Sequence, residues 1–284
     1  MDESGPERMK DYERERSSVD IPVTHISGAG RFSVPGLGDG RVAGVGHISP
    51  EEVRVSGTGT LPGGLNVGRV NTSGSANFKG DLMAETMKVS GTTTVQGSLN
   101  FGSLRSSGSL RVGGAARGCS MNASGLTKIE EGIELEDELV SSGSLIVDGD
   151  VSSKNTIDID GVVEIRGKIS TGLFEAYLNR GGSYVDGGIE AETVDIRRGG
   201  KYRVPLLPRI FRWEDREGDM RTTDVRGSRE VLIENVACEN VIGGRVVIGE
   251  GCEVSGKVIY TETVKVHEGA KVKNPPEKME PPGS

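Results

Sequence analysis

VSGTTTVQGSLNFGS, from Val89 to Ser103, decides the fold, because variants of this stretch recur along the chain at a nearly fixed step. The pairs that mark the repeat are seventeen residues apart and, in the last two steps, eighteen. They are Ser56-Gly57, Ser73-Gly74, Ser90-Gly91, Ser107-Gly108, Ser124-Gly125, Ser142-Gly143 and Asp160-Gly161. A constant period of this kind is the signature of a repeat architecture.

Aligning the repeats reveals three columns of apolar residues. The first contains Val53, Val70, Met87, Leu104, Met121, Leu139 and Ile157; the second Leu61, Phe78, Val95, Val112, Ile129, Val147 and Ile165; the third Leu65, Leu82, Leu99, Ala116, Ile133, Val151 and Ile169. After the first column comes a mostly polar position and then a small or apolar one, which is the period of a strand with one buried face. The columns therefore predict three short strands per repeat.

Glycines are expected at the bends between these strands. One set of turn glycines is Gly57, Gly74, Gly91, Gly108, Gly125, Gly143 and Gly161, and a second is Gly63, Gly80, Gly97, Gly114, Gly149 and Gly167. We attribute the tight turns to the freedom of glycine to adopt positive φ. Three strands and three bends predict a triangular coil of 17–18 residues, stacked on its neighbours as parallel ladders about 4.8 Å apart. The expected fold class is all-β, a parallel β-helix (solenoid).

Composition favours a solenoid over one large core. The 284 residues include 44 glycines, and only 4% are aromatic. A formal charge of -8 argues against nucleic acid as a partner, because phosphate binding needs a concentrated basic face. Cys119, Cys238 and Cys252 have no metal-ligand spacing and are expected to be reduced thiols of a cytoplasmic protein. The sequence has no apolar run of membrane-spanning or signal-peptide type.

The repeat frame divides the chain into six predicted regions. Residues 1–24 and 274–284 are polar tails that we expect to be disordered. A regular β-helix is expected over residues 25–172, followed by an irregular β continuation over 173–203. Residues 204–226 hold two prolines and the only tryptophan and are predicted to be a loop or linker. Residues 227–273 form a second predicted β-helical part.

The columns and Ser-Gly bends between about His25 and Gly172 resemble those of the bactofilins, which are polymer-forming cytoskeletal proteins. VLIENVACENVIGGRVVIGEGCEVSGKVIY, from Val231 to Tyr260, is similar to the carboxyl-terminal part of longer members from archaea and some Gram-positive bacteria. The resemblance implies a right-handed β-helix that assembles end to end into filaments without nucleotide. It also implies a scaffold for cell shape or protein localisation, in the cytoplasm and often at the inner face of the membrane.

The partners that the resemblance implies are further copies of the chain and membrane-associated proteins. It implies no catalytic residues, no cofactor and no metal. Independently of the family, a β-helix exposes ladder groups and a slice of core at its ends unless a helix or a polar coil caps them. The sequence has no amphipathic helix beside either end, so ends are expected to pair with ends. The alternative is a capped, monomeric rod that acts as an adapter.

Other function classes have weaker sequence support. β-Helices also carry acyltransferases, but the hexapeptide repeat of those enzymes has a period of six, which does not divide seventeen. His25, His47 and His267 are scattered in sequence, although folding could bring two of them together. EEGIELEDE (Glu130–Glu138) is expected to be a solvated acidic bend rather than a cation site. A surface adhesin is a further alternative, disfavoured by the missing signal peptide.

RIFRWEDR (Arg209–Arg216) is a candidate docking loop, in which Phe211 and Trp213 lie among charged residues. The competing interpretation is that these two rings pack against the rod.

Overall fold

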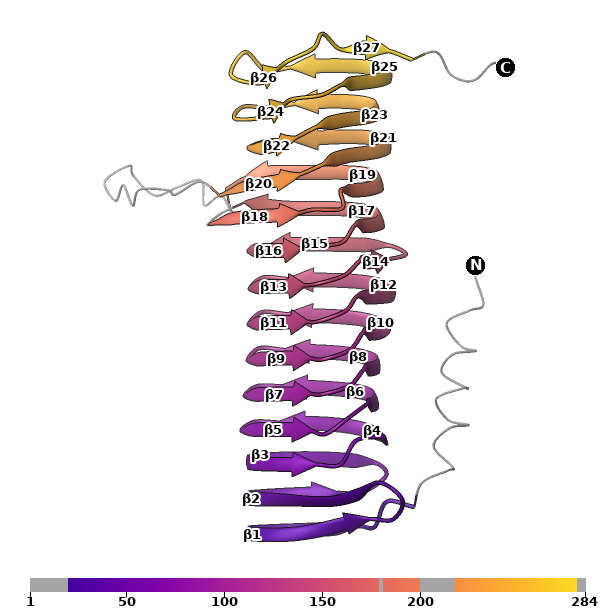
Figure 1. Ribbon diagram of the computed structural model, residues 1–284, viewed down its shortest axis with the longest axis vertical. Helices are drawn as coiled ribbons and strands as arrows, with labels where there is room; N and C mark the ends of the chain where they lie inside the picture. Colours follow the sequence, from indigo (N-terminus) through magenta and orange to yellow (C-terminus); the bar gives the residue numbers. More distant parts are fainter. Residues whose placement is uncertain (1–19, 179–180, 200–217, 280–284) are drawn as a thin grey trace, which may run out of the picture. The chain divides into compact units, whose positions relative to one another are not determined.

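A computed structural model describes residues 20–178, 181–199 and 218–279, which form strands, bends and turns without a helix. The chain divides into two compact units, Met1–Glu138 and Leu139–Ser284. Each unit is a stack of strands joined mainly by parallel ladders, and the coils amount to about 12 turns of β-solenoid (Figure 1). The predicted all-β solenoid is confirmed.

The first unit begins with three long strands and continues with alternating eight- and four-residue strands. They are β1 (Thr24–Val34), β2 (Gly38–Ile48), β3 (Glu52–Leu61), β4 (Leu65–Thr72), β5 (Ser75–Phe78), β6 (Leu82–Val89), β7 (Thr92–Val95), β8 (Leu99–Ser106), β9 (Ser109–Val112), β10 (Ala116–Ala123) and β11 (Leu126–Ile129). The boundary between the units falls inside β12 (Ile133–Ser141).

The second unit contains the remaining strands. They are β13 (Ser144–Val147), β14 (Val151–Ser153), β15 (Thr156–Asp160), β16 (Val162–Ile165), β17 (Ile169–Leu178), β18 (Gly182–Val185), β19 (Ile189–Arg198), β20 (Asp219–Thr222), β21 (Asp224–Ile233), β22 (Val236–Cys238), β23 (Asn240–Ile248), β24 (Glu253–Val254), β25 (Val258–Val266), β26 (Lys271–Val272) and β27 (Glu277–Lys278).

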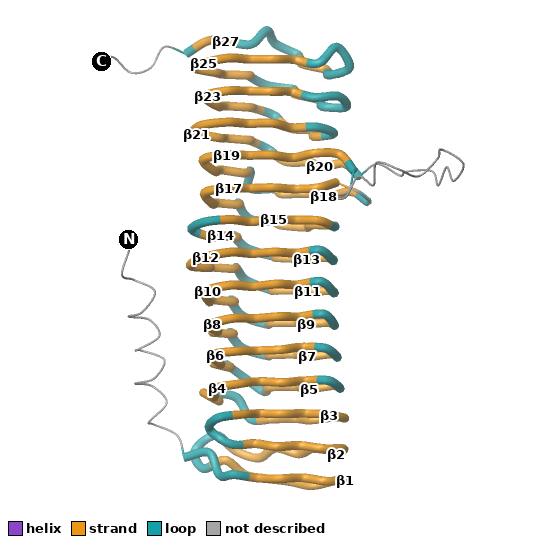
Figure 2. Tube along the Cα trace, turned by 180° about the vertical axis from the view of Figure 1, so that it is seen from behind, coloured by secondary structure: helices purple, strands orange, loops and turns teal. Residues whose placement is uncertain are grey.

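A regular coil of the first unit has three walls because its long strand changes phase halfway. In β6, Leu82 and Ala84 face inward, and then Met87 and Val89 do, with two outward residues between the pairs. The change of phase bends β6 into two walls, and β7 forms the third (Figure 2). Identical positions of β8 pair in register with β6. Each coil therefore stacks on the following coil in register, residue for residue.

Every residue of the three expected columns is buried, with an exposed fraction of 2% or less. The sequence did not reveal a further inward column, which alternates large and small residues. Its members are Val67, Ala84, Phe101, Gly118 and Leu135. A Cβ atom on Gly118 would overlap the ring of Phe101, so the glycine leaves the space that the ring fills.

Most turn glycines are required for a different reason from the one predicted. Gly74, Gly91, Gly108 and Gly125 do not have a positive φ; each lies against the carbonyl oxygen of the glycine one coil earlier, which a Cβ atom would overlap. Glycines of the second set, such as Gly97, likewise crowd backbone atoms of the preceding bend. Close stacking of bends, rather than left-handed backbone, selects glycine in the regular coils.

The chain upstream of Glu52 departs from the predicted regular β-helix. β1 pairs antiparallel with β2 along its whole length, and β2 pairs antiparallel with β3. The reversal between β1 and β2 is a hydrogen-bonded turn, in which Leu37 N donates to Val34 O over 3.0 Å and Gly36 has a φ of 78°. With Pro35 before this glycine, the turn is of type II. The turn reverses the chain too sharply for a full coil to form.

The second unit joins the parts that the sequence separated. Ile169 pairs with Ile189, a step of twenty residues, so residues predicted to be irregular form an ordinary parallel ladder with a longer coil. β18 pairs with β20 and β19 with β21, although residues 200–217 lie outside the described part. The predicted loop at 204–226 is therefore wrong for its last residues, which belong to β20 and β21. The predicted tail at 274–284 likewise contains β27, which pairs with β25.

Candidate assembly surfaces

The last coil of the second unit leaves part of its core uncovered. Val264 of β25 pairs with Val246 of β23, and Val266 pairs with Ile248. Val246 and Ile248 are fully buried, whereas Val264 is half-buried and Val266 is 42% exposed. β27 pairs with β25 only at Ile259 and Tyr260, and no other described strand extends that ladder over Val264–Val266. We call Val264, Val266 and this part of the β25 edge the open end.

The outermost strand of the first unit is sealed by contrast. Ile26 and Phe32 of β1 are 8% and 7% exposed, and Val34 is fully buried. The ring of Phe32 occupies the place where a Cβ atom on its cross-strand neighbour Gly40 would lie. The glycine thus lets a large ring lie flat over the core. We call β1 and β2, with Phe32 and Ile26, the closed end.

One edge of β1 has no partner strand among the described residues. β1 is the outermost strand of its unit in Figure 1, and its recorded pairing is with β2. His25 and Arg31 are its only ionisable residues, and Ser27, Gly28 and Ala29 are exposed. Natural edge strands are usually guarded by charges, proline or bulges, and a weakly charged edge is a template for pairing with another chain.

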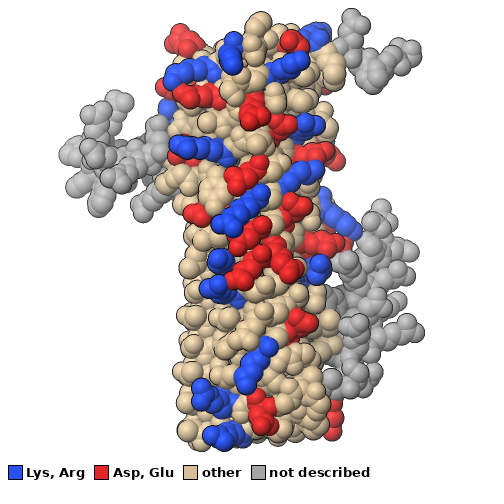
Figure 3. Space-filling view, viewed as in Figure 1, with Lys and Arg blue, Asp and Glu red and all other residues tan. Residues whose placement is uncertain are grey.

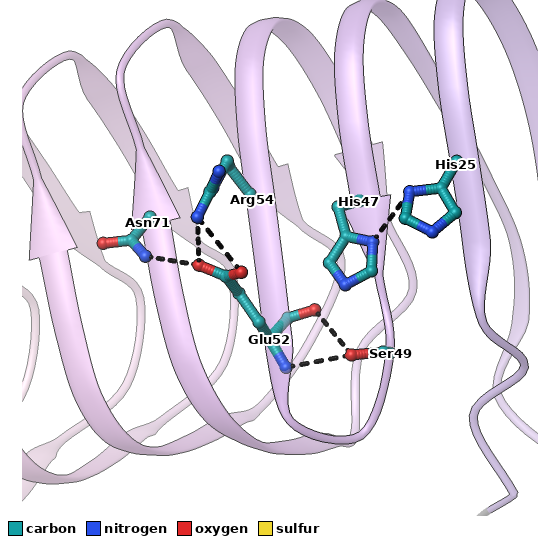
Figure 4. Close-up of polar contacts among 6 residues, drawn as sticks. All are labelled: His25, His47, Ser49, Glu52, Arg54 and Asn71. Carbon is teal, nitrogen blue, oxygen red and sulfur yellow. Dashed lines mark hydrogen bonds and ion pairs between the residues drawn. The ribbon is translucent and has the colours of Figure 1, made fainter.

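A polar cluster next to the closed end joins β3 to β4 (Figure 4). Arg54 Nη2 donates to the two carboxylate oxygens of Glu52 over 2.9 and 3.2 Å, and Asn71 Nδ2 donates to Glu52 Oε1 over 2.8 Å. Burial raises the pKa of Glu52, but the hydrogen bonds from Arg54 and Asn71, together with the charges of Arg54 and Arg69, outweigh it and lower the pKa below its ordinary value. The carboxylate is therefore committed to these two partners.

The two histidines of the same region lie side by side. His47 Nδ1 is 3.0 Å from His25 Nδ1, and the ring centroids are 4.4 Å apart. In sequence these residues are twenty-two positions apart, and only the register of the antiparallel hairpin brings them together. The signal that could have predicted this pairing is Pro35-Gly36, a turn dipeptide between two strand-like stretches.

All three cysteines are free. Burial, followed by Cys252 and Asp224, raises the pKa of Cys238 to about 12, and burial also raises the pKa of the Cys252 thiol. Burial and the nearby Asp137 raise the pKa of Cys119, which is exposed as a residue. Because the thiolate is the reactive form, these environments disfavour thiol chemistry.

The acidic run at Glu130–Glu138 is tied to basic residues of other coils. Glu130 accepts hydrogen bonds from Arg111, and Glu134 accepts one from Arg117 Nε over 3.2 Å. These pairs are exposed and contribute little to stability individually. Basic and acidic side chains are interspersed on the face shown in Figure 3, so this face has no field of a single sign.

The described residues contain neither a metal-binding cluster nor a membrane-spanning helix. No group of three or more His, Cys, Asp and Glu residues there could hold a metal ion. None of the described segments is a helix long and apolar enough to cross a membrane. Phe211 and Trp213, the candidate docking residues, lie outside the described residues.

No protein-family model matches the chain, and neither a curated protein nor a solved structure matches it. The bactofilin resemblance therefore depends on the columns and bends of the sequence, and what it implies about function is a proposal.

Proposed function

We propose that this protein is a bactofilin-like scaffold that polymerises without nucleotide through the ends of its solenoid. The open end is the observation that supports the proposal. Val264 and Val266 continue columns that are fully buried one coil earlier, so a coil of another copy laid on β25 would bury them in the same way. Such a copy would also pair the part of the β25 edge that β27 leaves open.

A filament needs two contact surfaces on each copy, because a single self-complementary surface produces only a closed pair. The unpartnered edge of β1 supplies the second. β1 is antiparallel to β2 and β2 to β3, so β1 runs in the same chain direction as β3 and the coils that follow it. Its apolar side chains are already covered, so this contact relies mainly on backbone hydrogen bonds. We expect the open-end contact to be the stronger of the two.

The experiment compares inward and outward substitutions on one strand. Val266→Lys places a charge in the contact, whereas the control Thr263→Lys adds the same charge on an exposed position of β25. Each protein is examined by negative-stain electron microscopy and sedimentation velocity at several concentrations, with chelator and without nucleotide. The parent and Thr263→Lys should form filaments.

Val266→Lys should form nothing longer than a pair of copies, because only the contact through the β1 edge remains once the open-end contact is lost. A parent that stays monomeric at every concentration would overturn the proposal and favour a capped adapter. Filaments of normal length from Val266→Lys would show that assembly uses a surface other than the open end.

A further inference from the structure

His25 and His47 face each other across the outermost strand pair of the first unit. They are directly opposite in the register of β1 and β2, and their rings are inclined by 32° with the Nδ1 atoms toward each other (Figure 4). His25 is exposed and His47 is half-buried. Together with Glu52, Arg54 and Val45 they line a shallow hollow open to solvent. The position between the two nitrogens is thus accessible.

At 3.0 Å the two Nδ1 atoms can form a hydrogen bond only if one carries a proton and the other presents its lone pair. A metal ion between them would take the place of that proton. Each neutral ring would then carry its own proton on Nε2 and donate its single Nδ1 lone pair to the metal. Binding in this form neither releases nor requires a net proton when both rings start neutral.

The separation of the nitrogens selects a coordination geometry. With metal–nitrogen distances of about 2.0–2.1 Å, two atoms 3.0 Å apart subtend about 91–97° at the metal. This is the angle between adjacent positions of a square-planar or octahedral ion. A tetrahedral ion requires nitrogens about 3.4 Å apart, which the side chains reach by moving a few tenths of an ångström. Imidazole nitrogen suits nickel, copper and zinc, and the first two favour the narrower angle.

We propose that His25 and His47 form a two-nitrogen binding site for a divalent transition-metal ion, with Ni²⁺ and Cu²⁺ preferred over Zn²⁺. Glu52 does not complete the site, because Arg54 and Asn71 hold its carboxylate. Water occupies the remaining coordination positions. The proposal does not depend on polymerisation.

A metal in this site would fasten β1 to β2. The histidines lie where β1 begins and β2 ends, at the opposite end of the hairpin from the Pro35-Gly36 turn. The turn already joins one end of the strand pair covalently, and the metal would join the other. Because the two ligands are adjacent only in the folded hairpin, metal binding stabilises it relative to the open form.

The test is calorimetric titration of the full-length, untagged, chelator-treated chain with NiCl₂. All proteins carry Cys119→Ser, which removes the exposed thiol as a competing ligand. His25→Gln and His47→Gln each delete one ligand, and His267→Gln is the matched control, since His267 is an exposed histidine of the second unit. We expect one ion per chain for the parent and the control. His25→Gln and His47→Gln should each bind Ni²⁺ at least about tenfold more weakly than the parent. Removal of a residue that only hydrogen-bonds to a metal ligand can already cause a loss of this size.

A second readout uses the parent alone, so that it does not depend on how the variants fold. Cu²⁺ should give an electron paramagnetic resonance spectrum with splitting from two imidazole nitrogens. Ni²⁺ should slow hydrogen exchange in β1 and β2 and leave β23 and β25 unchanged. Failure of the parent to bind, affinities of both pair variants within twofold of the parent's, or loss of binding in His267→Gln alone would each overturn the proposal.

Discussion

Glycine occupies the same bend in the antiparallel layers β1–β3 and in the parallel coils β4–β11, but for different reasons. Gly28, Gly44 and Gly57 are aligned by the register of the antiparallel strands, and Gly74 stacks on Gly57 to begin the column of the coils. In the antiparallel layers these glycines have φ values of 97°, 125° and 124°. In the coils the φ values are ordinary, and the oxygen of the preceding bend excludes a side chain. A glycine column alone therefore does not distinguish the two arrangements.

The two arrangements also differ in how the core is covered. Each inward residue of a regular coil is covered by its counterparts in neighbouring coils. At the closed end that role falls to single large side chains, of which Phe32 is the largest. At the open end of the second unit, Val266 has no such cover within the described residues. The inward side chains of an outermost strand are thus covered at the closed end and partly exposed at the open end.

The largest expected effect tests this difference in covering. Phe32→Ala should lower the free energy of unfolding by about 3–5 kcal/mol, because it removes a buried ring over a glycine that cannot fill the space. Val266→Ala should change it by no more than about 0.5 kcal/mol, since the side chain is largely solvated already. Urea unfolding, followed by hydrogen exchange in each strand, measures the change in the free energy of unfolding for both variants. Exchange strand by strand separates the two effects if the repeat array unfolds in stages.

Phe32→Leu is the control, because it retains most of the apolar volume and should cost much less than Phe32→Ala. Equal losses for Phe32→Ala and Val266→Ala would mean that the ring does not seal the closed end.

The sequence predicts the coils well because their period is strict. Each inward slot recurs at the ladder spacing, so a column such as Val70, Met87 and Leu104 can be identified without coordinates. The hairpin was missed because Gly40, Val42 and Gly44 keep the period of two of a strand, whatever the direction of that strand. Alternation indicates which face is buried and does not indicate whether the neighbour is parallel or antiparallel.

The candidate surfaces were less predictable for a related reason. The His25–His47 contact depends on the register of one hairpin, and that register depends on a turn whose reversal had to be recognised first. The open end could not be predicted because burial of an inward residue depends on whether another coil covers it. Val264 and the fully buried Val246 are both inward valines of one column. Sequence periodicity identifies the members of a column, but burial of the last member depends on what lies beyond it.

A second prediction separates the two uses of glycine. Gly108→Ala should destabilise the first unit by about 1–3 kcal/mol, because its Cβ atom would overlap the Gly91 oxygen and both bends would have to shift. Gly36→Ala has open space around the new atom and costs about 1–2 kcal/mol through its left-handed φ alone. Asparagine tolerates left-handed backbone, so Gly36→Asn should recover part of the loss.

Gly108→Asn should be worse than Gly108→Ala, because the conflict there is steric. Thermal unfolding of the four variants provides the comparison. Recovery by asparagine at both positions would show that the bends of the coils are strained in the same way as the hairpin turn.

The smallest expected effect concerns hydroxyl groups inside the coils. Thr72 and Thr93 are hydrogen-bonded through their Oγ1 atoms over 2.7 Å, while Ser106 and Thr127, the same positions two coils later, are buried with unpartnered hydroxyls. Thr93→Val leaves the Thr72 hydroxyl without a partner and should destabilise by about 1 kcal/mol. Thr127→Val keeps the shape and removes an unpaired group, so it should be neutral or stabilising by up to about 1 kcal/mol. Urea unfolding measures the change in the free energy of unfolding for both variants. Changes of opposite sign would show that neighbouring coils of one shape differ in how their hydroxyl groups are paired. A loss of stability in both variants would mean that the Thr127 hydroxyl has a partner in solution.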